Sequence, residues 1–209
     1  MTMRKKLLIT IACLSVILCT MIVGTFAWLT DKTGSVTNTF TPSNIKIGLT
    51  ESDNLDLKMV PGTTITKDPV VTVAANSEKC WVFVEIKEEL GVWSDNGGKF
   101  SDYLTYTVIT GENGWTQLLD NNNTPVSGVY YREVDASETA QGFPVLKDNK
   151  IMVNASVTKG MMDEFYNAEG TLKSEADAKR PTLTFTAYAC QREGFSSAAA
   201  AWAEIPKNP

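Results

Sequence analysis

Residues 80–87 read CWVFVEIK and form the clearest β-strand pattern in the chain. Every second residue from Val82 to Ile86 is apolar, and a period of two predicts a strand with one buried face. Trp81 and Phe83 fall on the opposite face, which therefore also carries large apolar side chains. Exposed aromatics of this kind mark a binding face, unless a second layer covers them. A short helix at 196–205, which contains Trp202, is the natural cover.

Short β-rich stretches recur along the chain at roughly 8–12 residue intervals, separated by turn-forming Gly, Pro, Asn and Asp. Many short strands with turns between them predict an all-β antiparallel sandwich. Helix signals are few and short. Besides 80–87, strands are predicted at 45–49, 63–73 with an interruption at Pro69, 103–110, 115–119, 129–134, 151–157 and 181–191, and further helices at 159–168 and 173–178.

The N-terminus has the pattern of a secretory signal peptide. Arg4, Lys5 and Lys6 precede Leu7–Val23, which runs for 17 residues without a charge. Small residues follow and end at Ala27, so cleavage is predicted between Ala27 and Trp28. The protein is then secreted to the extracellular matrix or cell surface, and it is tethered to the membrane until the signal is removed.

Three parts are predicted: a signal peptide at 1–27, an extended N-terminal segment at 28–43, and a β-sandwich domain at 44–209 that ends in a short helix. The net charge of −5 becomes −8 once the three basic residues leave with the signal. Such an acidic domain is a poor candidate for binding nucleic acid, which needs a basic patch.

The chain contains no histidine. This excludes Ser-His-Asp and Cys-His catalysis, HExxH zinc sites and the commonest general base at neutral pH. No catalytic residue, cofactor or metal ligand is predicted. The turn at 120–123 offers oxygen ligands for calcium but lacks the closing Glu of an EF-hand, so a solvated turn is expected. Other acids that could bind calcium are Asp53, Asp56, Glu85, Glu88, Glu89, Asp163 and Glu164.

Two cysteines, Cys80 and Cys190, remain after the signal. Antiparallel pairing of 80–87 with the last strand would bring them near each other, and export permits oxidation. Side-chain parity places them on opposite faces, whereas a disulfide needs Cβ atoms about 3.5–4.5 Å apart. Two free, partly buried thiols are predicted, with a single bridge as the alternative.

Several motifs resemble the TasA and camelysin family of secreted bacterial proteins, which are processed by the signal peptidase SipW. The matching stretches cover the signal junction and most of the domain, in the same order. They are GTFAWLTD at 24–31, SVTNTFT at 35–41, NIKIGLTE at 44–51, VPGTTITKDP at 60–69 and AYACQREGF at 187–195. From sequence alone, Pro61-Gly62 is a turn and Lys67 with Asp68 is a solvated pair.

The resemblance implies a jelly-roll sandwich that assembles into biofilm matrix fibres. It implies that the segment freed by cleavage adds as a strand to the next subunit, with signal peptidase and an accessory matrix protein as further partners. Val36, Asn38 and Phe40 share one side of that segment, so Val36 and Phe40 would be its apolar anchors. A disordered spacer is the alternative for this segment.

Two other functions stay open. One is a secreted monomeric module that binds carbohydrate or another matrix protein through an aromatic platform, although most aromatics of a sandwich fill the core. The other is a camelysin-like metallopeptidase, which the lack of histidine disfavours. The platform candidates are Trp81, Trp93, Trp115, Tyr103, Tyr106, Tyr130 and Tyr131.

Overall fold

A computed structural model describes residue 3 and residues 44–52, 57–90, 98–174 and 180–206. Contacts divide the chain into Met1–Thr41 and Pro42–Pro209, and the fold is that of the second unit. The predicted signal peptide and the segment 28–43 lie outside the described residues, and with them Ala27, Trp28, Val36, Asn38 and Phe40.

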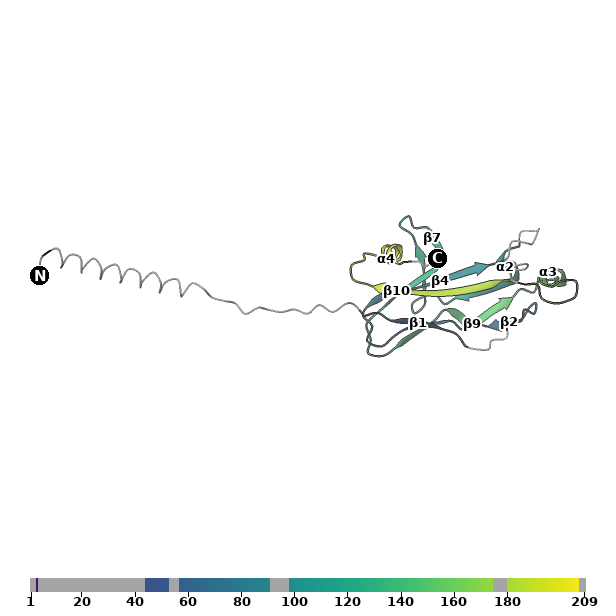
Figure 1. Cartoon of the computed structure of the whole chain (residues 1–209), viewed down its shortest axis with the longest axis horizontal. Helices are drawn as coiled ribbons and strands as arrows, with labels where there is room; N and C mark the ends of the chain where they lie inside the picture. The colour runs from purple at the N-terminus through teal and green to yellow at the C-terminus, as the bar shows by residue number, and fades with distance from the viewer. Residues whose placement is uncertain (1–2, 4–43, 53–56, 91–97, 175–179, 207–209) are drawn as a thin grey trace. The chain divides into compact units, whose positions relative to one another are not determined.

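The domain is an all-β antiparallel sandwich, as the sequence predicts, and its strands form two layers (Figure 1). One layer has the order β10-β4-β7-β6. These strands are β4 (Cys80–Glu89), β6 (Thr116–Leu119), β7 (Pro125–Val134) and β10 (Thr182–Gln191).

The other layer consists of two short sheets, β1-β3-β8 and β2-β9-β5. Strand β2 leads into β3 across the buried Pro69, and β8 leads into β9 across Val145. The Val145 N–H donates to the Pro69 carbonyl at 3.0 Å, which joins the two sheets into one bent layer. Its strands are β1 (Ile47–Thr50), β2 (Thr64–Thr66), β3 (Val70–Val73), β5 (Leu104–Val108), β8 (Gln141–Pro144) and β9 (Leu146–Val153).

The main core lies between the two layers. Val82, Val84 and Ile86 of β4 face Val71 and Val73 of the other layer, and none is more than 4% exposed. Alternating burial, as in β3, turns one face of a strand toward the other layer, which is how a sandwich builds its core. The described strands and their antiparallel pairing are consistent with the predicted all-β sandwich.

Three short helices complete the described fold. Helix α2 (Phe100–Tyr103) precedes β5, α3 (Lys159–Asp163) follows β9, and α4 (Ala198–Glu204) follows β10. The Thr158 and Ser197 side chains cap the N-termini of α3 and α4 by accepting backbone N–H groups. Of the three predicted helices, 196–205 is confirmed and 159–168 is shorter than expected. Of 173–178, only Lys173 and Ser174 are described, and they are not helical; the rest lies outside the described residues.

Candidate functional site

Strand β2 is one of the six strands that lie at the end of a sheet in the described part of the chain, and it therefore has an open edge. Among the described residues, β2 pairs only with β9, through Thr64, Ile65 and Thr66. The Val153 N–H donates to the Thr63 carbonyl and the Lys67 N–H donates to the Asn149 carbonyl, so the odd-numbered residues bond to β9. In an antiparallel ladder the alternate residues point their N–H and C=O groups the other way. Thr64 and Thr66 therefore present two donors and two acceptors at an open edge.

An apolar groove of about 400 Å³ lies beside this edge. It opens between the interior face of the β2-β9-β5 sheet and the start of β10. Its volume is within the roughly 300–1,000 Å³ that is common for ligand pockets. The apolar lining comes from Leu57, Met59, Ile65, Leu104, Ile151 and Leu183, and Lys67 and Arg180 add two cations.

The stretch VPGTTITKDP forms the frame of this groove. Pro61-Gly62 is a turn, in which the Thr63 N–H donates to the Val60 carbonyl at 3.0 Å. Gly62 has φ +76°, which glycine tolerates best. The predicted turn is therefore confirmed, and it places Val60 just before the start of β2.

The predicted solvated pair of Lys67 and Asp68 is wrong in its partners. Lys67 Nζ lies 2.6 Å from Glu51 Oε2, and the lysine side chain is only 14% exposed. Asp68 accepts the Ser52 N–H at 3.0 Å and the Ser52 hydroxyl. These hydrogen bonds from Ser52 lower the pKa of the Asp68 carboxyl below its ordinary value. Lys67 and Asp68 therefore hold Glu51 and Ser52, the two residues that follow β1, against the end of β2. The spacing of residues in the sequence does not reveal these partners.

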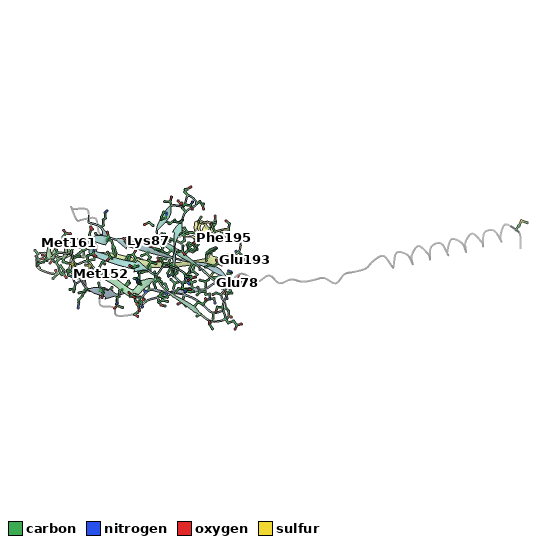
Figure 2. The ribbon with its side chains drawn as sticks, turned by 180° about the vertical axis from the view of Figure 1, so that it is seen from behind. Glu78, Lys87, Met152, Met161, Glu193 and Phe195 are labelled. Atoms are coloured by element: carbon green, nitrogen blue, oxygen red, sulfur yellow. The ribbon has the colours of Figure 1, made fainter. Side chains whose placement is uncertain are left out.

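The aromatic face of β4 is covered. Phe83 is fully buried against Trp202 of α4, with ring centroids 5.2 Å apart. Tyr188 of β10 meets the same tryptophan edge-on, with ring centroids 5.3 Å apart. Phe83 and Trp202 belong to a second, smaller hydrophobic cluster, and Phe195, labelled in Figure 2, packs against it. The terminal helix therefore covers Phe83, as the second alternative expects. Trp81 is only partly buried and lies edge-on to Tyr131 with ring centroids 5.7 Å apart, so this face is no open platform.

The remaining platform candidates are mostly core residues. Tyr103 and Trp115 are buried, and Trp93 lies outside the described residues. Tyr106 is half-buried and donates its hydroxyl to Glu88 Oε1 at 2.8 Å. With Tyr130 they line a shallow hollow of about 290 Å³. Burial, followed by the hydrogen bond to Glu88, raises the pKa of Tyr106, which stays protonated at neutral pH.

Cys80 and Cys190 are free thiols, as predicted. Their strands pair antiparallel, but Cys80 lies opposite Gln191 and Cys190 opposite Trp81. The two side chains therefore point to opposite faces of the sheet. Burial raises the pKa of the Cys80 thiol to about 11, with a smaller contribution from Cys190. Because a nucleophilic cysteine needs a lowered pKa, Cys80 is a core residue.

The turn at 120–123 is closed by its own backbone. One oxygen of the Asp120 carboxylate accepts the N–H groups of Asn122 and Thr124, both at 2.8 Å. The expected solvated turn therefore explains these residues without a calcium ion. In the described part of the chain, no group of three or more acidic or cysteine side chains is placed to hold a metal. Asp53 and Asp56 lie outside that part.

Sequence reasoning missed the residues that line the groove. Leu57 and Met59 are apolar residues just ahead of the Pro-Gly turn, and this apolar pair is the signal in the sequence that could have revealed the groove.

Within the described residues, no helix has both the length and the apolar character needed to cross a membrane. No family model, curated protein or solved structure gives a significant match to this chain.

Proposed function

We propose that this chain is a secreted structural protein whose subunits polymerise into extracellular biofilm matrix fibres by donor-strand addition. Signal peptidase cuts between Ala27 and Trp28 and frees the segment 28–43. That segment then pairs with the open edge of β2 in the next subunit. In this role the chain resembles the TasA and camelysin proteins. The proposed fibre subunit has no catalytic activity and needs no cofactor.

The observation that supports this most is the open edge of β2 beside an apolar groove. Strand addition uses main-chain hydrogen bonds for affinity and pockets for alternate side chains for specificity. Thr64 and Thr66 offer the hydrogen bonds. The groove offers room for Val36 and Phe40, which the spacing of two places on the same side as Asn38.

Head-to-tail addition also explains a fibre rather than a closed ring. The donor segment precedes β1 and the acceptor edge is β2, so donor and acceptor are different surfaces of one subunit. A heterologous contact of this kind grows without limit unless its rotation happens to close.

The experiment compares the mature chain with donor variants by electron microscopy and size exclusion. Phe40→Asp places a charge in an apolar groove and is expected to abolish fibres. Thr39→Asp, on the other side of the segment, is the matched control and should still assemble. Equal fibre yields from both variants would reject the donor role of Phe40.

The acceptor side is tested with Thr66→Pro. Proline removes the N–H that faces the open edge but leaves the bonds between β2 and β9, and edge strands tolerate it. We expect a folded subunit, shown by an unchanged unfolding midpoint, that no longer accepts a donor strand. Normal fibres from this variant would place the acceptor elsewhere.

A second candidate is a monomeric module that binds carbohydrate, and the hollow at Tyr106 and Glu88 favours it. A tyrosine ring beside a carboxylate suits the apolar face and the hydroxyl groups of a sugar. Size exclusion separates the two candidates, because a mature chain that stays monomeric under all conditions cannot form fibres by itself.

A further inference from the structure

Strand β10 is the longest of the six strands that lie at the end of a sheet in the described part of the chain. It has 10 residues, whereas the other five have 3 to 5. Natural proteins protect sheet edges by short strands, prolines, charged side chains or bulges, because a long exposed edge pairs with another chain. Length therefore protects the other five edges but not that of β10.

The sequence of β10 lacks the other protections as well. It reads TLTFTAYACQ and contains no charged residue and no proline. Its register with β4 runs without a break from Thr182 to Gln191, so no bulge turns the edge away. High β-propensity together with low charge is the composition that favours pairing between chains.

The outer edge of β10 presents a full row of backbone groups. The Arg192 N–H donates to the Lys79 carbonyl at 3.1 Å, in register with the β10–β4 ladder. Even-numbered residues of β10 therefore bond to β4, and odd-numbered residues point their N–H and C=O groups outward. The outward residues are Leu183, Phe185, Ala187, Ala189 and Gln191, whereas the open edge of β2 offers only Thr64 and Thr66.

The described fold leaves this edge accessible. No described strand pairs with β10 on the side away from β4 (Figure 1). Every residue of β10 is half-buried or exposed, whereas the neighbouring β4 buries Val82, Phe83 and Val84 completely. This is the burial expected of a strand whose outer side faces solvent.

We propose that β10 pairs antiparallel with β10 of a second copy of this chain about a two-fold axis, which joins two four-stranded sheets into one. A two-fold axis places the same edge on both sides, so the contact is self-complementary. Copies of a chain with a net charge of −5 repel each other, and a strand without charge is where this repulsion opposes contact least. The pairing does not rest on the fibre role, because donor addition uses β2; in a fibre it would link two fibres side by side.

The direction of the backbone groups limits the register. Outward residues must lie opposite outward residues, so the two registers with the most overlap are centred on Thr186 or on Ala187. The first sets Arg180 of one copy opposite Arg192 of the other, and like charges directly opposite destabilise a strand pair. The second sets Thr186 opposite Tyr188, and such β-branched–aromatic pairs stabilise sheets. We therefore expect the axis at Ala187.

Disulfide trapping tests the pairing and its register. With the axis at Ala187, position 184 of one copy lies opposite Cys190 of the other in a non-hydrogen-bonded pair, with Cα atoms about 4.5 Å apart. This separation suits a disulfide. The mature Thr184→Cys variant should form an intermolecular disulfide between position 184 and Cys190 under mild oxidation, identified by mass spectrometry.

The matched control is Thr182→Cys, which lies opposite Cys190 only in the register centred on Thr186. It should link at least several-fold less than Thr184→Cys. Equal or stronger linking of Thr182→Cys would overturn the register at Ala187. No dimer linked through Cys190 in either variant would overturn the pairing itself.

Sedimentation velocity tests the pairing without an added cysteine. Ala187→Pro removes an outward N–H but keeps the bonds between β10 and β4, and should raise the dimer dissociation constant at least about tenfold. Thr184→Lys adds the kind of charge that protects natural edges and should act in the same direction. Thr116→Lys, at an exposed residue of β6 on the other edge of this sheet, is the matched control. Unchanged dimerisation of both β10 variants would overturn the proposal.

The Phe40→Asp variant separates this pairing from the fibre role. Its donor segment lacks the apolar anchor, so it should form dimers but no fibres. A monomeric Phe40→Asp subunit would assign the edge of β10 to the donor segment and overturn the pairing of two copies. Dimers without fibres from the wild-type mature chain would reject the fibre role and support the pairing.

Discussion

The two edges of the sandwich are finished in different ways. At one edge, β5 passes into β6 through the turn at 111–114, so the chain itself crosses from one layer to the other. The Trp115 N–H donates to the Ile109 carbonyl at 2.7 Å, and the Trp115 ring is 1% exposed. We call this the closed edge. At the open edge of β2, the contacts of Lys67 with Glu51 and of Asp68 with Ser52 hold the neighbouring chain at the end of the strand.

The comparison sets an edge that the chain crosses with its own turn against an edge that keeps unpaired backbone groups. At the closed edge, the hydrogen bond from Trp115 to Ile109 and the buried Trp115 ring hold the two layers together. Within the described residues, no strand pairs with the outward backbone groups of Thr64 and Thr66 at the open edge. An edge with unpaired backbone groups is a site for adding another chain.

The largest expected effect is at the closed edge. Trp115 packs in the main core, and its Nε1 donates to the Pro144 carbonyl at 3.0 Å. Trp115→Ala should lower the free energy of unfolding by about 3–5 kcal/mol, because it leaves a large cavity. Leu57→Ala at the open edge is the matched substitution. Urea unfolding followed by fluorescence or circular dichroism should show the difference, and equal losses would contradict this division of the two edges.

A smaller effect is expected from added methyl groups. A Cβ on Gly114 would lie 2.6 Å from the Ile109 carbonyl oxygen, whereas a Cβ on Gly48 of β1 would meet nothing within 4 Å. Gly114→Ala should therefore cost about 1–3 kcal/mol, as overpacking does. Gly48→Ala should stay within about 1 kcal/mol of the wild type. Thermal unfolding of the two variants measures this, and a tolerant Gly114 would mean that the closed edge can shift.

The smallest expected effect concerns pH at the open edge. The pKa of Asp68 is lowered by Ser52, so the ionised carboxylate favours the folded state. The contribution is complete above the ordinary aspartate pKa of about 3.9 and is lost as the pH falls through the lowered folded-state value. The stability of Asp68→Asn should depend less on pH in this range than that of the wild type. Identical slopes would show that the contact of Asp68 with Ser52 is not held by charge.

Much of the fold follows from local sequence pattern. Alternation in 80–87 correctly predicts β4 and its buried face, and the same signal predicts β10. Strand β8 was missed because Gln141-Gly142-Phe143-Pro144 has a turn-like composition, and only pairing with β3 makes it a strand. Strand β7 begins at Pro125, ahead of the predicted 129–134, because Pro125 and Gly128 give its first residues a turn-like composition as well.

The sequence by itself determined the all-β class, the turn at Pro61-Gly62 and the separation of the two thiols. These depend on period-two alternation, on fixed φ preferences and on side-chain parity, all of which are local. Only the tertiary structure decided that Lys67 and Asp68 hold Glu51 and Ser52, that α4 buries Phe83, and that β2 keeps an open edge beside a groove. Those features depend on residues that are distant in sequence and come together only when the two layers pack.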